Sequence, residues 1–204
     1  MRWILLLLVG VALLIFMLRG CSRKVSIPSG TIVFLGDSIT AGYGLAPNQA
    51  YPALIEINGM TMVNLGVSGS KTGDGLQRLK AYFNGGGNPR LVVIALGAND
   101  ILQGANPSEI ESNLGAAVRE CQGRSVPVML CGIRIPEQVG TESIFSDVAN
   151  QYHIALLPDL MQGEETEENF LQEDHMHPNA VGQRLIADKM KAALLQSFSF
   201  QALR

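Results

Sequence analysis

Cysteines and basic residues are scarce in this 204-residue sequence, and each scarcity excludes a class of protein. Three cysteines are too few for a disulfide framework, and no two of them have the spacing of a zinc site. Four of the 15 basic residues lie in the first 24 positions, so the remainder carries 11 basic and 18 acidic residues, a formal charge of about −7. Because an acidic chain without a basic face repels the phosphate backbone, we expect no nucleic-acid partner.

The first 24 residues differ from the rest because Trp3 to Leu18 form a run of sixteen residues without a charge. A helix of that length spans about 24 Å, which suffices for a bilayer core of about 30 Å when flanking anchors assist. A cleaved signal peptide, a retained anchor and a lipoprotein signal acylated at Cys21 all stay open, although Arg19 is atypical of the last. We expect residues 1–24 to make the protein membrane-associated or exported, in a bacterial-type periplasmic or other extracytoplasmic location.

Five apolar runs alternate with helical patterns after a short linker at residues 25–30. The runs are continuous, as in strands of a parallel sheet that helices cover on both faces. They lie at residues 31–36, 61–66, 91–97, 126–133 and 154–158. This order predicts one domain over residues 31–204, a three-layer α/β/α sandwich around a five-stranded parallel sheet.

Three longer helices are predicted from the period of their apolar residues. The first includes residues 74–83 and buries Leu76, Leu79 and Phe83. The second follows Asn106, which can cap it, and has Pro107 in its first turn. The third extends over about residues 178–196, and its expected buried residues are Val181, Leu185, Ile186, Met190 and Leu194. Cys121 and Cys131, at the ends of a helix and a strand, are expected to be small buried side chains.

Polar and glycine-rich segments follow the first three strands, at the end of a parallel sheet where ligand sites lie. They are residues 36–38 (Gly-Asp-Ser), 68–70 (Ser-Gly-Ser) and 97–100 (Gly-Ala-Asn-Asp). The loop "DHMHPN" at 174–179 precedes the last helix. We expect all four segments to meet at one rim of the sheet.

Ser38 becomes a nucleophile if a base removes its proton and a third group orients that base. Of the three histidines, His153 lies at the opposite end of the predicted sheet and is expected to be structural. His175 and His177 both lie in the right loop. Asp174, three residues before His177, can orient that imidazole, and the proline after His177 keeps it extended. These features favour His177 as the base over His175.

A reaction at Ser38 also needs hydrogen-bond donors for a developing oxyanion. The candidates are the backbone N–H groups of Ser38 and Gly69 and the carboxamide of Asn99. Asp37 is expected to bond loop amides rather than to act in the triad. The acidic residues 163–174 are expected to form a solvated loop, with carboxylate ligation of a metal as the lesser alternative.

The segments "GDSIT", "GAND" and "DHMHPN" together resemble the SGNH (GDSL-type) hydrolases, named for Ser, Gly, Asn and His in four blocks. The matching residues are Ser38, Gly69, Asn99 and His177, with Asp174 completing the triad. Further segments, "LGDSITAGYGL", "VNLGVSG" and "IRIPEQVG", are similar to the thioesterase I, lysophospholipase and arylesterase branch. The resemblance covers about residues 31–190.

This resemblance implies a flavodoxin-like sheet, no metal or other cofactor, and hydrolysis through an acyl-serine. The implied substrates are small acyl esters, thioesters or lysophospholipids, and the apolar N-terminus favours esters found at a membrane. Thr40 stands where a Gly-x-Ser-x-Gly elbow requires glycine, so an α/β-hydrolase nucleophile is not expected.

Two other functions stay open. One is a carbohydrate-type O-deacetylase of the same fold. The other is a non-catalytic flavodoxin-like module that binds a phosphate, FMN, lipid or glycan. The loop after the first strand has no basic residue, and Asp37 would repel a phosphate. A complete Ser-His-Asp set also argues against a module without catalysis.

Overall fold

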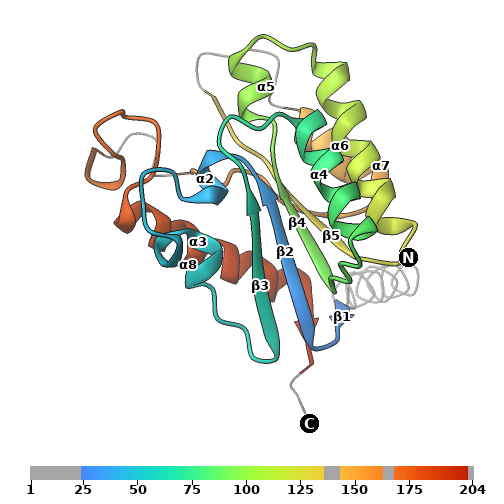
Figure 1. Cartoon of the computed structure of the whole chain (residues 1–204). Helices are drawn as coiled ribbons and strands as arrows, with labels where there is room; N and C mark the ends of the chain where they lie inside the picture. Colours follow the sequence, from blue (N-terminus) through green and yellow to red (C-terminus); the bar gives the residue numbers. More distant parts are fainter. Residues whose placement is uncertain (1–23, 136–142, 163–167, 202–204) are drawn as a thin grey trace, which may run out of the picture.

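A five-stranded parallel sheet forms the centre of the computed structural model, which describes residues 24–135, 143–162 and 168–201. The strand order is β3-β2-β4-β5-β6, and every neighbouring pair is parallel. The strands are β2 (Gly30–Gly36), β3 (Met60–Gly66), β4 (Leu91–Ala95), β5 (Val128–Cys131) and β6 (Ala155–Leu157). Helices cover both faces of this sheet, so the predicted three-layer α/β/α fold is confirmed (Figure 1).

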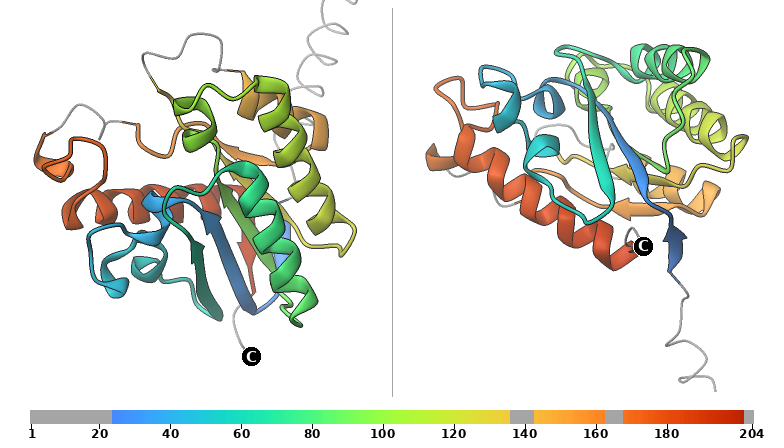
Figure 2. Two further views of the ribbon diagram at one scale, coloured as in Figure 1. Left: turned by 45° about the horizontal axis from the view of Figure 1, so that its top comes forward. Right: turned by 60° about the horizontal axis from the view of Figure 1, so that its bottom comes forward.

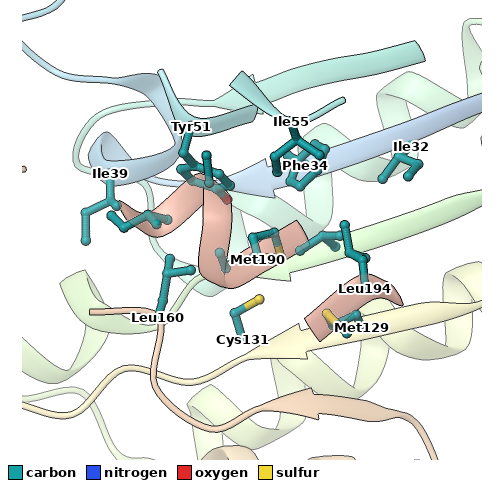
Figure 3. Packing of buried hydrophobic residues seen from close by; sticks show 14 of the residues in the cluster. Ile32, Phe34, Ile39, Tyr51, Ile55, Met129, Cys131, Leu160, Met190 and Leu194 are labelled. Carbon is teal, nitrogen blue, oxygen red and sulfur yellow. The ribbon is translucent and has the colours of Figure 1, made fainter. Parts of the chain in front are cut away.

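The two faces of the sheet pack against different helices. One face holds α4 (Thr72–Asn84), α6 (Pro107–Gln122) and α7 (Ile144–Tyr152), and the other holds α8 (Ala180–Ser197) with the short α3 (Tyr51–Leu54). Alternate residues of β2 enter the two cores: Ile32 and Phe34 face α8, and Val33 and Leu35 face α4. Figure 3 shows the α8 side, where Phe34 lies beside Tyr51 and Ile55, and Met190 and Leu194 of α8 belong to the same cluster.

The structure differs from the predicted linker at residues 25–30. Val25–Ile27 forms a short strand, β1, that pairs in parallel with β7 (Phe198–Phe200) near the C-terminus. Gly30 already belongs to β2. A strand of three residues is too short to show a periodic pattern, and its partner lies more than 170 residues away in the sequence. The sequence therefore could not distinguish Val25–Ile27 from a linker.

The predicted helices are present, but part of the last one is exposed. Leu76, Leu79 and Phe83 are buried on α4, and the Asn106 side chain accepts a hydrogen bond from Ser108 N at 3.0 Å to cap α6. On α8, Ile186, Met190 and Leu194 are buried. Val181 and Leu185 are 54% and 36% exposed, and their predicted burial was therefore wrong. At about 100° per residue, both lie outside the narrow stripe that faces the sheet.

Cys121 and Cys131 are free and buried, as expected, and burial raises the pKa of the Cys121 thiol to about 12. Within the described ranges, no helix is both long and apolar enough to cross a bilayer. Of the predicted signal or anchor at residues 1–24, all but Lys24 lies outside the described residues.

Candidate active site

Ser38 lies directly beyond the end of β2, at the first residue of the short helix α2 (Ser38–Ala41). The Asp37 carboxylate caps this helix by accepting a hydrogen bond from Ile39 N at 3.0 Å. A Cβ at Gly36 would overlap the Thr40 side chain, so a larger residue could not close this turn. Helices α2 and α5 (Ala98–Leu102) lie beyond the same end of the sheet, and β1 lies at the other end (Figures 1 and 2).

The structure brings Ser38, His177 and Asp174 into one hydrogen-bonded line. Ser38 Oγ and His177 Nε2 are 2.9 Å apart, and His177 Nδ1 and Asp174 Oδ2 are 2.6 Å apart. The other carboxylate oxygen of Asp174 accepts hydrogen bonds from the backbone N–H groups of His177 (2.9 Å) and Met176 (3.0 Å). One carboxylate therefore orients both the imidazole and the loop that carries it.

The charge of Asp174 is stabilised by these contacts. Its pKa is lowered to about 2, first by the backbone hydrogen bond from His177 and then by the bonds from the imidazole and Met176 N, against the cost of burial. The carboxylate is therefore ionised wherever His177 can act as a base. An ionised partner at Nδ1 leaves Nε2 free to accept a proton from Ser38.

Gly69 and Asn99 line the same cavity as Ser38. Gly69 has a φ of +75°, and open space surrounds the place where a Cβ would stand, so a substrate oxygen can approach its backbone N–H. The Asn99 side chain donates to Ser70 O at 3.1 Å, which fixes the carboxamide beside Gly69. The buried Asp100 accepts bonds from Thr72 N and Thr72 Oγ1, at 2.9 and 2.6 Å, and joins the two loops.

The cavity around Ser38 has a volume of about 670 Å³, within the range of small-molecule sites. Its apolar lining includes Leu102, Ile133, Ile135, Met161, Leu171 and Met176. Another hollow of similar volume, about 660 Å³, lies near β3 and α8 and contains none of the predicted catalytic residues. The apolar walls beside Ser38 suit an acyl chain or an aromatic ring.

The other two histidines occupy different positions. His175 also lines the cavity, but its backbone has a φ of +54°, and it is His177 that contacts Ser38. His153 ends α7 and lies in a hollow with Val25 and Phe198, at the end of the sheet opposite Ser38. Part of the acidic segment 163–174 lies outside the described residues. Within the described part of the chain, no group of three or more His, Cys, Asp or Glu side chains could hold a metal ion.

Sequence patterns did not indicate two residues that contact this site. The Tyr43 ring lies against the His177 ring, with a centroid separation of 4.5 Å and an interplanar angle of 36°. Arg78 of α4 donates to Gly36 O, Leu65 O and Ser70 Oγ at 2.8–2.9 Å. Tyr43 stands in a turn and Arg78 on the polar side of a helix, so neither belongs to a periodic pattern.

Comparisons with known proteins agree with this geometry. The sequence profile of the GDSL-like lipase/acylhydrolase family matches residues 34–185. The chain is 32% identical over 173 residues to the thioesterase 1/protease 1/lysophospholipase L1 of Escherichia coli strain K12, covering 80% of this chain and 83% of that protein. It is 29% identical to an arylesterase of Vibrio mimicus, covering 91% and 98%.

Solved structures share the fold. The esterase EstA from Pseudoalteromonas sp., inhibited by monoethylphosphonate, superposes with a TM-score of 0.77 at 30% identity, covering 81% of this chain and 97% of EstA. A crystal structure of TesA superposes with a TM-score of 0.75 at 29% identity, covering 82% and 99%.

Proposed function

This chain belongs to the GDSL-like lipase/acylhydrolase family, whose solved members include SGNH hydrolases, and we propose that it hydrolyses esters and thioesters through Ser38, His177 and Asp174. The observation that carries this assignment is the unbroken line from Ser38 Oγ to His177 Nε2, at 2.9 Å, and from His177 Nδ1 to Asp174 Oδ2, at 2.6 Å. Side chains 139 residues apart in sequence meet there with the spacing that nucleophilic catalysis requires.

The first half of the reaction acylates Ser38. His177 Nε2 removes the hydroxyl proton while Oγ attacks the acyl carbon and forms a tetrahedral oxyanion. The N–H groups of Ser38 and Gly69 and the Asn99 carboxamide donate to that oxygen. Collapse of the intermediate breaks the bond to the alcohol or thiol, which takes the proton held on His177.

The second half of the reaction releases the acid. A water gives a proton to His177 Nε2 and attacks the acyl-serine carbon, and the same three donors stabilise the second oxyanion. Collapse then breaks the bond to Oγ, which recovers its proton from His177. Asp174 remains ionised throughout and stabilises the imidazolium in both halves.

The apolar cavity supports carboxylic esters and thioesters with a hydrocarbon or aryl group as substrates. Apolar side chains make up much of its lining, which favours an acyl or aryl ester over a sugar acetate. The relatives named above include a thioesterase/lysophospholipase and an arylesterase, in agreement with such substrates.

A chain-length series with a nucleophile variant tests the function. We would assay the full chain in detergent against p-nitrophenyl esters from acetyl to palmitoyl, with Ser38→Ala and, as a matched control, Ser146→Ala on α7. Ser38→Ala is expected to lower kcat by at least about 10⁴-fold without loss of the folded state. Comparable activity in both variants would refute Ser38 as the nucleophile, and turnover restricted to acetyl esters would favour a deacetylase.

We also propose that residues 1–24 hold the protein at a membrane, on its extracytoplasmic side. The basis is the uncharged run Trp3 to Leu18 followed by Cys21. Incorporation of labelled palmitate that Cys21→Ser abolishes would support a lipoprotein. A membrane-bound but unlabelled chain would support a retained anchor, and release of the full-length protein into the soluble fraction would refute anchoring.

A further inference from the structure

Gln172 lies five residues before the base His177, and Gln183 lies six residues after it. The side chains of both glutamines form hydrogen bonds with the segment that carries Ser38. The Gln172 side chain donates to Tyr43 O at 2.7 Å. The Gln183 side chain donates to Ile39 O at 3.0 Å. Both acceptors follow Ser38 in the sequence, on the same segment. Each glutamine therefore joins the His177 segment to the Ser38 segment by a contact other than the hydrogen bond between His177 and Ser38.

Gln172 closes a ring of contacts with the triad. Its amide nitrogen donates to both Tyr43 O and Pro178 O, and its backbone N–H donates to His177 O at 2.8 Å. Tyr43 N in turn donates to Ser38 O at 3.0 Å. Hydrogen bonds therefore link Ser38 to Tyr43, Tyr43 to Gln172 and Gln172 to His177. The 2.9 Å hydrogen bond between the imidazole and the Ser38 hydroxyl closes this ring.

The neighbouring backbone is shaped for the Gln172 side chain. Gly44 has a φ of +75°, and a Cβ at that position would overlap Gln172 Oε1. A left-handed glycine therefore allows the amide to reach Tyr43 O. Leu171 and Pro178 form an antiparallel bridge that holds the base of the loop.

Gln183 makes the second connection in the core. Its side chain is 1% exposed, its Oε1 accepts from Tyr51 N at 2.7 Å and its Nε2 donates to Ile39 O. The Tyr51 hydroxyl lies 3.1 Å from Thr40 Oγ1, on the same helix as Ser38. The buried Gln183 amide thus fixes the start of α8, which follows the His177 loop, to α2. Both its oxygen and its nitrogen have hydrogen-bond partners.

These contacts matter because the Ser38–His177 hydrogen bond breaks and re-forms in every cycle and cannot by itself maintain the distance between its partners. The loop around His177 is exposed at residues 173–176. A displacement of about 1 Å between reacting groups can lower turnover about 100-fold.

We propose that Gln172 and Gln183 are positioning residues that hold His177 Nε2 within hydrogen-bond distance of Ser38 Oγ. This role rests on the proposed function of the triad. It requires that Gln172 act as a donor, because its amide nitrogen faces two carbonyl oxygens.

The test compares Gln172→Met, Gln172→Glu and Gln183→Met with Gln151→Met, a change at an exposed glutamine of α7. Gln172→Glu keeps the shape of the side chain but places a carboxylate against two carbonyl oxygens, so we expect the larger loss from it. We expect kcat on p-nitrophenyl butyrate to fall about 10- to 100-fold in the three site variants, with KM changed less than about twofold. The control should match the wild type.

Two further readouts separate positioning from a purely structural role. Titration of active sites with an alkyl phosphonate gives kcat per competent molecule, and the low-field proton resonance of the His177–Asp174 bond reports the imidazole geometry. Positioning predicts slower phosphonylation and a shifted or broadened resonance in variants that remain folded.

A lower melting temperature with unchanged kcat per site and an unchanged resonance would overturn the inference. Gln172→Met is the decisive variant if Gln183→Met fails to fold, because Gln172 lies outside the main core. Full activity in Ser38→Ala would refute the triad itself. An inactive Ser38→Ala beside fully active glutamine variants would refute the positioning role alone.

Discussion

Asp37, which precedes the nucleophile, is a buried carboxylate that the reaction does not use. Its side chain is 4% exposed, and burial raises its pKa to about 6, although the hydrogen bond from Ile39 N and the charges of His177 and Arg78 oppose the shift. At neutral pH the carboxylate is therefore ionised, but in surroundings where ionisation is less favourable than in the unfolded chain. The residue caps α2 at a cost in stability.

Replacing Asp37 with Asn removes that cost while keeping a side-chain oxygen for the cap. Between the ordinary pKa of 3.8 and about 6, the folded state binds more protons than the unfolded state, so wild-type stability falls as pH rises through this window. We expect Asp37→Asn to be more stable than the wild type by up to about 3 kcal/mol at pH 8 and equal to it near pH 4. Urea unfolding at several pH values measures this difference, and a pH-independent difference would contradict it.

At the scale of elements, Arg78 connects the ends of two strands. The guanidinium group of this α4 residue donates to Gly36 O at the end of β2, to Leu65 O on β3 and to Ser70 Oγ in the loop that holds Gly69. Desolvation lowers the pKa of Arg78, and the nearby charges of Asp74 and Asp37 oppose that shift. One side chain thereby fixes the nucleophile turn relative to the oxyanion donors.

Arg78→Lys tests this connection because lysine keeps the charge but cannot reproduce the planar fork of donors. We expect the free energy of unfolding to fall by about 1–3 kcal/mol, because Leu65 O and Gly36 O lose the hydrogen bonds from the guanidinium group, although Gly36 O keeps the one from Val67 N. We also expect a lower kcat on a short ester, because Ser70 O holds the Asn99 carboxamide. Arg184→Lys, at an exposed position of α8, is the control. A destabilised variant with wild-type kcat would limit Arg78 to a structural role.

At the scale of the whole molecule, the described chain begins at the pole opposite the active site. Val25–Ile27 pairs with β7 there, and the seven residues of β2 then carry the chain about 23 Å toward Ser38 (Figure 1). Only six residues, 19–24, separate the uncharged run from β1, and they reach about 20 Å at most. With the run in a bilayer, the pocket would lie at the end of the molecule away from that bilayer. This geometry argues against the expectation that the apolar N-terminus favours esters found at a membrane, and it favours esters that arrive from the aqueous side.

Insertion of a flexible linker tests this geometry in vesicles that hold the full chain. We expect a lysophospholipid in the same bilayer to be hydrolysed at least about tenfold faster after insertion of 30 Gly/Ser residues between Lys24 and Val25, since such a linker spans about 30 Å on average. Hydrolysis of soluble p-nitrophenyl butyrate should not change and serves as the internal control. Equal lysophospholipid rates with the short and the long linker would contradict the orientation.

Much of the fold could be predicted because its signals are local. Continuous apolar runs identified all five strands of the main sheet, and Asn106 and the apolar stripe of α6 identified that helix. Ser38, Gly69, Asn99 and the residues 174–177 were nominated by their places after strands and before α8, since the ends of parallel strands meet at one edge. The strand β1 and the exposure of Val181 and Leu185 could not be predicted, because distant packing decides them.

The layers of the fold, the family resemblance and the residues of the candidate site all followed from the sequence. The preference for His177 over His175 came from the sequence, and the contact with Ser38 agrees with it. In contrast, the contact of Tyr43 with the imidazole and the links of Gln172 and Gln183 to the nucleophile segment became visible in the structure alone. This difference comes from separation along the chain. Periodicity and capping act over a few residues, whereas contacts between residues 38 and 177, or 39 and 183, exist only after the sheet has formed.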